Sequence, residues 1–223
     1  MYDAHCHQTD PAAYQEARAA GIDGWLWAAL EPADPAPSGV WRAYGLHPWN
    51  ALEHDRAWCE NALELLDHRL QTERPEAVGE IGLDFFRATT PAARSHARWV
   101  FEQQLELAGK HNLPVVVHSV RCHSEMTRLL RHANLSRAGI MHAFFGPPKA
   151  YREMGYLLSL GPHSLEGAMP KEGILLETDA PARDATLTDL VRVAQTVAER
   201  LGLEVLELTR QCDAALRKCL GLD

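Results

Sequence analysis

The chain has 223 residues, of which 46% are hydrophobic and 23% are charged. A chain of this length and composition can bury one sizeable core, and α/β barrels of about this size commonly form one domain. No run approaches the roughly 18 consecutive apolar residues of a membrane span, and the first residues carry neither a basic segment nor an apolar stretch. We therefore expect one domain over residues 1–223, without membrane association and with a cytoplasmic location.

Thirty acidic residues against 22 basic ones give a net charge of −8. This excess argues against broad adhesion to a phosphate backbone, so a nucleic-acid substrate would have to be held locally, with bound metal supplying positive charge. The five cysteines are odd in number and form no C-x-x-C pair, which argues against a disulfide framework and against a structural zinc site. We expect reduced thiols.

Short apolar runs alternate with longer amphipathic segments, which is the pattern of β-α units around a parallel sheet. The predicted strands are 2–7, 24–30, 41–46, 77–81, 113–118, 139–142, 155–160 and 173–178. The predicted helices are 11–20, 55–72, 91–111, 124–133, 149–154, 186–201 and 204–220. Eight strands favour a closed barrel, although the spacing alone also fits seven strands or an open sheet.

Metal-binding side chains lie at or just past the carboxyl ends of five predicted strands, and these ends share one face in a parallel barrel. They are His5, His7, Glu80, His118, His142 and Asp179. His5 and His7 are two residues apart on a strand, so both side chains point the same way. A lone histidine at a strand end is usually a hydrogen-bonded rim residue, but five such ends together favour a metal site.

The number of these side chains predicts two metal ions. Four imidazoles and two carboxylates are too many for one catalytic zinc, which usually takes three protein ligands and keeps an open position. Two divalent ions would use all six, with one carboxylate bridging, and would generate a bridging hydroxide near neutral pH. Imidazole-rich ligation suits Zn²⁺ or Mn²⁺, and the carboxylates would also accept Mg²⁺. The expected reaction is hydrolysis at a phosphoryl or carbonyl group.

Several segments agree, in order and approximate spacing, with the signature blocks of one family. They are Asp3-Ala-His5-Cys-His7, Gly45-Leu-His47-Pro48, Gly79-Glu80-Ile-Gly-Leu-Asp84, Leu113-Pro-Val-Val-Val-His118-Ser119, His142-Ala-Phe144 and Leu176-Glu-Thr-Asp179-Ala-Pro181. Over nearly its whole length the chain thus resembles the TatD family of metal-dependent deoxyribonucleases.

The resemblance implies a TIM-type (β/α)8 barrel with an additional C-terminal helix. It also implies that His5, His7 and Asp179 bind one metal, that His118 and His142 bind the other, and that Glu80 bridges them. Asp179 would accept the proton of the attacking water. Because the family hydrolyses phosphodiester bonds in DNA and commonly trims 3′ ends, the expected substrate is DNA, single-stranded or at its 3′ ends.

The sequence departs from the family pattern around the expected site. After Asp179 the family usually has a longer loop with a phosphate-contacting motif, whereas here Arg183 is the only basic side chain before the next helix. Residues 161–170 form a shorter segment than usual, and Val120 stands where arginine is common, with Arg121 displaced by one position. A more open site, or one that a protein partner completes, would fit these changes.

Four residues are expected to contact the substrate: His47, Trp49, Arg121 and Arg183. His47 keeps the family match and is either a phosphate contact or a structural turn residue, whereas Trp49 breaks the match and could stack on a base. Two other functions stay open. The same metals could hydrolyse another phosphoester or an amide, as in related amidohydrolase-type barrels, or the chain could be a partner-dependent subunit of a larger assembly.

Overall fold

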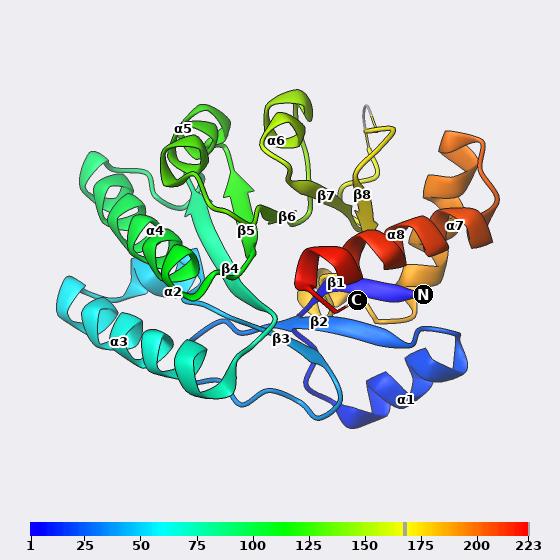
Figure 1. Cartoon of the computed structure of the whole chain (residues 1–223), viewed down its shortest axis with the longest axis horizontal. Helices are drawn as coiled ribbons and strands as arrows, with labels where there is room; N and C mark the ends of the chain where they lie inside the picture. The colour runs from blue at the N-terminus through cyan, green and yellow to red at the C-terminus, as the bar shows by residue number, and fades with distance from the viewer. Residues whose placement is uncertain (167–168, 223) are drawn as a thin grey trace.

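The protein is a nearly closed barrel of eight parallel strands, each paired with its sequence neighbours (Figure 1). The computed structural model describes residues 1–166 and 169–222. The strands are β1 (Tyr2–Cys6), β2 (Gly24–Ala28), β3 (Trp41–Tyr44), β4 (Ala77–Asp84), β5 (Val115–Val120), β6 (Gly139–Met141), β7 (Leu157–Leu160) and β8 (Ile174–Leu176). The predicted eight-stranded barrel is therefore confirmed.

Helices surround the sheet on its outer side (Figure 1). They are α1 (Pro11–Ala19), α2 (Pro48–Glu53), α3 (Arg56–Glu73), α4 (Pro91–His111), α5 (His123–Ala133), α6 (Lys149–Glu153), the 3-10 helix η1 (Ala182–Asp184), α7 (Asp189–Leu201) and α8 (Val205–Leu220). The seven predicted helices are present, with ends within three residues of the predicted ones. Helices α2 and η1 were not predicted. Within the shortened segment 161–170, residues 167 and 168 lie outside the described residues.

Local signals in the sequence set the helix ends. The hydroxyl of Thr90 accepts the backbone N–H of Ala93 at 3.1 Å, so α4 has a capped start with Pro91 in its first position. The same helix ends at Asn112, whose φ of 53° is the left-handed conformation that asparagine tolerates. Among the described residues, no helix has the length and apolar character needed to cross a membrane.

The inside of the barrel is apolar at the end opposite the predicted metal site. Seven strands contribute small or aliphatic residues to one buried cluster: Ala4, Leu26, Ala28, Ala43, Ala77, Val116, Ile140 and Leu175. Leu216 and Leu220 of α8 join this cluster, so the C-terminal helix covers that end of the barrel beside β1 and β8. The polar site therefore lies next to an apolar part of the barrel interior.

Hydrogen bonds join the end of β1 to the residues that follow β8. Just beyond the strand ends, the N–H of His7 donates to the carbonyl of Ala180 at 2.7 Å, and the N–H of Asp179 donates to that of His5 at 3.0 Å. Deeper in the seam the buried carboxylate of Asp3 accepts the Thr178 hydroxyl at 2.6 Å and the N–H groups of Thr178 and His5 at 3.0 and 3.2 Å. One side chain thus joins the two strands.

We expect Asp3→Ala to lower the free energy of unfolding by about 2–4 kcal/mol, because it leaves buried donors on both strands unpaired. Urea denaturation monitored by circular dichroism measures this loss. Asp3→Asn is the matched control, since its amide oxygen still accepts the two backbone N–H groups and its NH₂ can donate to Thr178. Equal stability of Asp3→Ala and the wild type would contradict the proposed role of Asp3 in closing the seam.

Candidate metal centre

Seven side chains gather at the carboxyl ends of the strands. They are the six residues predicted as ligands, His5, His7, Glu80, His118, His142 and Asp179, together with His47. They form three overlapping groups, and within each group the candidate ligand atoms lie within 4.8 Å of one another. His5 and Glu80 each belong to two groups, so the cluster is continuous.

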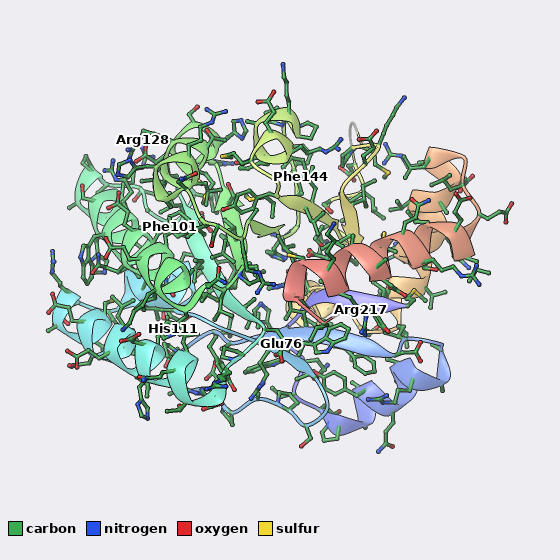
Figure 2. The ribbon with its side chains drawn as sticks, viewed as in Figure 1. Glu76, Phe101, His111, Arg128, Phe144 and Arg217 are labelled. Atoms are coloured by element: carbon green, nitrogen blue, oxygen red, sulfur yellow. The ribbon has the colours of Figure 1, made fainter. Side chains whose placement is uncertain are left out.

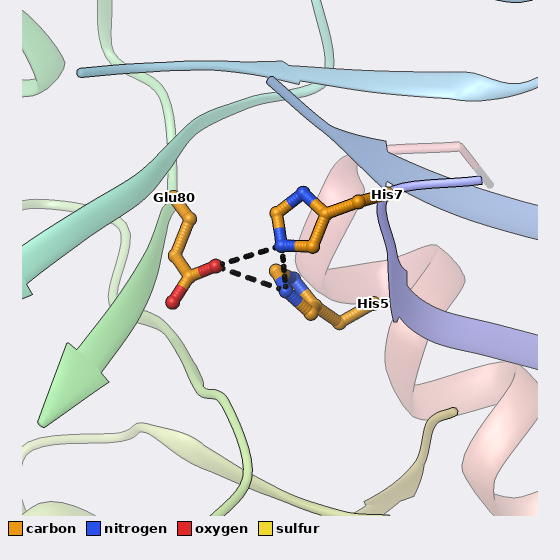
Figure 3. A group of neighbouring side chains, drawn as sticks. All are labelled: His5, His7 and Glu80. Atoms are coloured by element: carbon orange, nitrogen blue, oxygen red, sulfur yellow. Dashed lines mark hydrogen bonds and ion pairs between the residues drawn. The ribbon is translucent and has the colours of Figure 1, made fainter. Parts of the chain in front are cut away.

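The first group combines His5 and His7 of the β1 end with Glu80 of β4 (Figure 3). The two Nε2 atoms are 3.1 Å apart, and each lies 3.1 Å from Oε2 of Glu80. Oδ1 of Asp179 lies 3.7 Å from both Nε2 atoms. His7 donates its Nδ1–H to the carbonyl of Ala28 at 2.7 Å, so in the neutral ring Nε2 carries the lone pair. Two ring nitrogens and two carboxylates thus converge on one point.

The other oxygen of Glu80 faces different imidazoles. Oε1 lies 2.6 Å from Nδ1 of His118, 3.5 Å from Nε2 of His47 and 3.7 Å from Nε2 of His142. The ring of His142 also lies close to His5, with 3.9 Å between the ring centroids, and it forms a group with His5 and Asp179. Each oxygen of Glu80 therefore faces a different set of imidazole nitrogens, and His142 lies between the two sets.

A glycine in β4 allows Glu80 to reach His118. Gly82 pairs with His118 in the neighbouring strand and has a φ of 150°. A Cβ atom at this position would lie only 2.0 Å from the carbonyl oxygen of His118, so any other residue would push the two strands apart. The close approach keeps Glu80 within hydrogen-bonding distance of His118.

The charges in the cluster compensate one another. Burial opposes ionisation of Glu80, but His142, His47 and His5 outweigh it and hold the pKa of this carboxyl well below its usual range. Burial also opposes protonation of His142, yet Glu177 and Glu80 raise its pKa to about 10. Burial lowers the pKa of His5, and the neighbouring His142 lowers it further. A cation that binds Nε2 of His142 would therefore displace a proton.

Carboxylates lie behind two rings of the cluster. Glu177 is fully buried, and its Oε1 lies 2.9 Å from Nδ1 of His142 and accepts the N–H of Ala143 at 2.8 Å. This contact favours a proton on Nδ1 and leaves Nε2 to face the cluster. Oδ2 of Asp84 lies 3.6 Å from Nε2 of His118. Sequence reasoning missed both carboxylates, although Glu177 stands two residues before Asp179, a spacing that could have indicated it.

His47 differs from its neighbours in which nitrogen carries the proton. As the N-cap of α2, it accepts the backbone N–H of Trp49 at its Nδ1, at 3.2 Å. In a neutral ring the proton then sits on Nε2, the atom that faces Glu80. His47 is thus arranged as a hydrogen-bond donor toward the cluster rather than as a metal ligand.

The structure distinguishes the other predicted substrate contacts. The indole N–H of Trp49 donates to Oδ2 of Asp84 at 2.8 Å, and the guanidinium of Arg87 lies 3.8 Å from its ring, so Trp49 forms a wall of the site. Arg121 is exposed and lines a cavity that also contacts His142. Arg183 is exposed in η1 and makes no ion pair with any residue that the structure describes.

The donor set fits divalent cations. Nε2 of His7 faces Nε2 of His5 and a carboxylate oxygen, an arrangement that suits a positive charge between the three atoms. Among the described residues, Nδ1 of His5 and Nε2 of His118 are buried without hydrogen-bond partners. Imidazole and carboxylate donors suit Zn²⁺, Mn²⁺ and Mg²⁺ in differing degree. This cluster can therefore hold metal.

Comparison with known proteins agrees with this site. The sequence model of one family, described as TatD related DNase, matches residues 2–221. The uncharacterized metal-dependent hydrolase YjjV of Escherichia coli (strain K12) is 30% identical over 207 residues, which is 80% of this chain and 78% of that protein. The 3'-5' ssDNA/RNA exonuclease TatD of Edwardsiella piscicida is 34% identical over 200 residues, 77% and 73% of the two chains.

Solved structures agree as well. The crystal structure of the TatD homolog YjjV from Escherichia coli K12 matches with a TM-score of 0.88 at 25% identity, over 100% of this chain and 98% of that one. A TatD family hydrolase from Entamoeba histolytica shares the fold, with a TM-score of 0.80 at 14% identity over 100% and 98% of the two chains. The chain belongs to the family of TatD-related DNases and is a metal-dependent hydrolase.

Proposed function

We propose that this hydrolase uses two divalent cations to remove nucleotides from the 3′ end of single-stranded DNA. The observation that carries the proposal is the division of Glu80 between two sets of donors. Its Oε2 faces His5 and His7, whereas its Oε1 faces His118. A carboxylate placed in this way suits a bridge between two cations. His5, His7 and Asp179 would hold one cation, and His118 and His142 the other.

The name of the Edwardsiella piscicida relative, a 3'-5' ssDNA/RNA exonuclease, supports a nucleic-acid substrate. The net charge of −8 requires that the substrate phosphate be neutralised locally. When bound, the cations would acidify a water molecule and neutralise charge on the phosphoryl oxygens. The free thiols of all five cysteines favour a reducing compartment such as the cytoplasm.

Asp179 is suited to accept the proton of the attacking water. Its side chain is 21% exposed, whereas that of Glu80 is 1% exposed, so solvent reaches Asp179 directly. The water oxygen forms a bond to phosphorus as its proton passes to Asp179. The bond between phosphorus and the 3′ oxygen of the preceding nucleotide breaks, this oxygen takes up a proton from solvent, and a nucleoside 5′-monophosphate is released. The Nε2–H of His47 would hydrogen-bond to a phosphoryl oxygen.

Incubation with end-labelled DNA tests this function. In the presence of Zn²⁺, Mn²⁺ or Mg²⁺, we expect stepwise release of mononucleotides from the 3′ end of a single strand, and EDTA should abolish it. Asp179→Asn should lower kcat about 10²- to 10⁴-fold, the range for loss of a general base.

Asp184→Asn is the matched control, because Asp184 is an exposed acid in the same turn. It should keep wild-type turnover. Unchanged turnover in Asp179→Asn would refute the mechanism. Hydrolysis of amides in place of DNA would refute the proposed substrate. Turnover only after a partner protein is added would refute the proposal that this chain forms a complete site.

A substitution can distinguish hydrogen-bond donation by His47 from binding of metal by His47. We expect His47→Asn to retain its metal content but to lower kcat/KM about 100-fold, in the range for loss of one donor to a developing negative charge. Asparagine keeps an N-cap acceptor, so α2 should be preserved. Metal analysis by mass spectrometry and steady-state kinetics provide the two readouts. Loss of one equivalent of metal would instead make His47 a ligand.

Glu177 should tune metal affinity through His142. Glu177→Gln removes the charge that holds the proton on Nδ1, and we expect metal affinity to fall about 10- to 100-fold, as for other residues that orient ligands. Calorimetric titration of the metal-free protein measures this change. Glu172→Gln is the control, because Glu172 is exposed and pairs with Arg152 at 2.7 Å. Equal affinities for the wild type and Glu177→Gln would contradict the role of Glu177.

A further inference from the structure

A cavity of about 610 Å³ opens beside the metal centre. His142 belongs to both, and Ser119, which follows His118, also lines the cavity. The other walls come from the start of α5 and from the segment between β6 and α6. The volume lies within the range of about 300–1,000 Å³ that is typical of small-molecule sites. Whatever binds here would lie next to the reacting phosphate.

The walls of the cavity suit a flat, uncharged group. Met141, Phe144 and Tyr151 form a buried apolar surface, and Phe144 lies beside α6 (Figure 2). Nδ1 of His123 lies 3.1 Å from the hydroxyl of Tyr151, so two polar groups are available to the edge of a ring. Glu125 also lines the cavity, but ion pairs with Arg98 and Arg128 at 3.2 and 2.9 Å compensate its charge.

Phe145 presents an aromatic ring at this cavity. Its side chain is 76% exposed, the largest exposure among the large hydrophobic residues that the structure describes. The backbone around it is fixed, because the N–H of Ala143 donates to Glu177 and the N–H of Phe144 donates to the carbonyl of Ser159 at 2.8 Å. A single exposed aromatic residue is common on protein surfaces. Here the ring belongs to a cavity that adjoins the metal centre, so it is placed to meet the substrate.

A positive charge lines the same cavity. Arg121 has a left-handed φ of 54°, and its guanidinium lies 4.6 Å from the ring of the exposed Phe86. In an acidic protein this charge favours a phosphate group beside the apolar wall of the cavity. The cavity thus combines stacking surface, ring-edge partners and one cation.

We propose that this cavity binds the base of the 3′-terminal nucleotide, which stacks on Phe145. The inference rests on the proposed function, because that nucleotide is the one whose phosphate would lie on the metal centre. A base still paired in a duplex could not enter the cavity. Aromatic stacking does not depend on base identity, so all four terminal bases would be accepted.

Two esters test the subsite by kinetics. Methyl 4-nitrophenyl phosphate has no base, whereas the 4-nitrophenyl ester of thymidine 5′-phosphate has one and shares the same leaving group. We expect Phe145→Ala to raise KM for the nucleotide ester about tenfold, in the range for loss of one stacked base, and to leave KM for the base-free ester unchanged. Phe145→Trp should preserve the wild-type KM. Leu206→Ala is the matched control, because Leu206 is also an exposed hydrophobic residue but belongs to α8.

Equal effects of Phe145→Ala on both esters, or no effect on either, would overturn the subsite while leaving the proposed function intact. A binding experiment decides the matter even if neither ester is cleaved. The Kd of Asp179→Asn for a fluorescein-labelled single strand is measured by anisotropy, with a normal or an abasic 3′ end. Adding Phe145→Ala should weaken binding of the normal end about tenfold and leave the abasic end unaffected, and equal changes for both ends would overturn the subsite.

Discussion

The fully buried carboxylate of Glu80 must stay ionised for this site to bind cations. The imidazoles around it provide the positive charge that keeps it ionised. Glu80 stands in the barrel on an apolar floor, where an isolated charge is strongly unfavourable. Imidazoles from several strands surround Glu80. Glu177 lies on the far side of His142 as a second buried charge, and the His142 ring balances this charge as well. Without metal, protonated histidine supplies the compensating charge, so the same geometry suits proton and cation alike.

The same contacts close the barrel and position part of the site. The hydrogen bonds that join the first strand to the segment after the last also bring Asp179 opposite His5 and His7. Asp3 takes part in this seam although it contacts no reacting group, because its carboxylate binds donors on both strands. The backbone of Asp179 has a φ of 59°, a left-handed conformation that the surrounding contacts must hold.

The barrel and the strand-end cluster could be predicted because both follow from local patterns, namely alternating apolar runs and the polar residues that end them. Helix α2 could not, since six residues are too few for a helical period to be visible. The contact of Glu177 with His142 depends on how the ends of β6 and β8 lie in three dimensions. The cavity in front of Phe145 depends on how the segment after β6 lies against the start of α5. The tautomer of His47 likewise follows from its cap position, which only the structure reveals.

The place of Asp179 in the chain has a consequence for biosynthesis. A ribosome releases the N-terminal strands first, so a nascent chain ending before β8 already holds His5, His7 and Glu80. It has neither Asp179 nor the helix α8 that covers the opposite end of the barrel. Such an intermediate lacks one of the predicted metal ligands, and the end of the barrel opposite the metal site is uncovered. A chain that ends before β8 therefore cannot form the complete site.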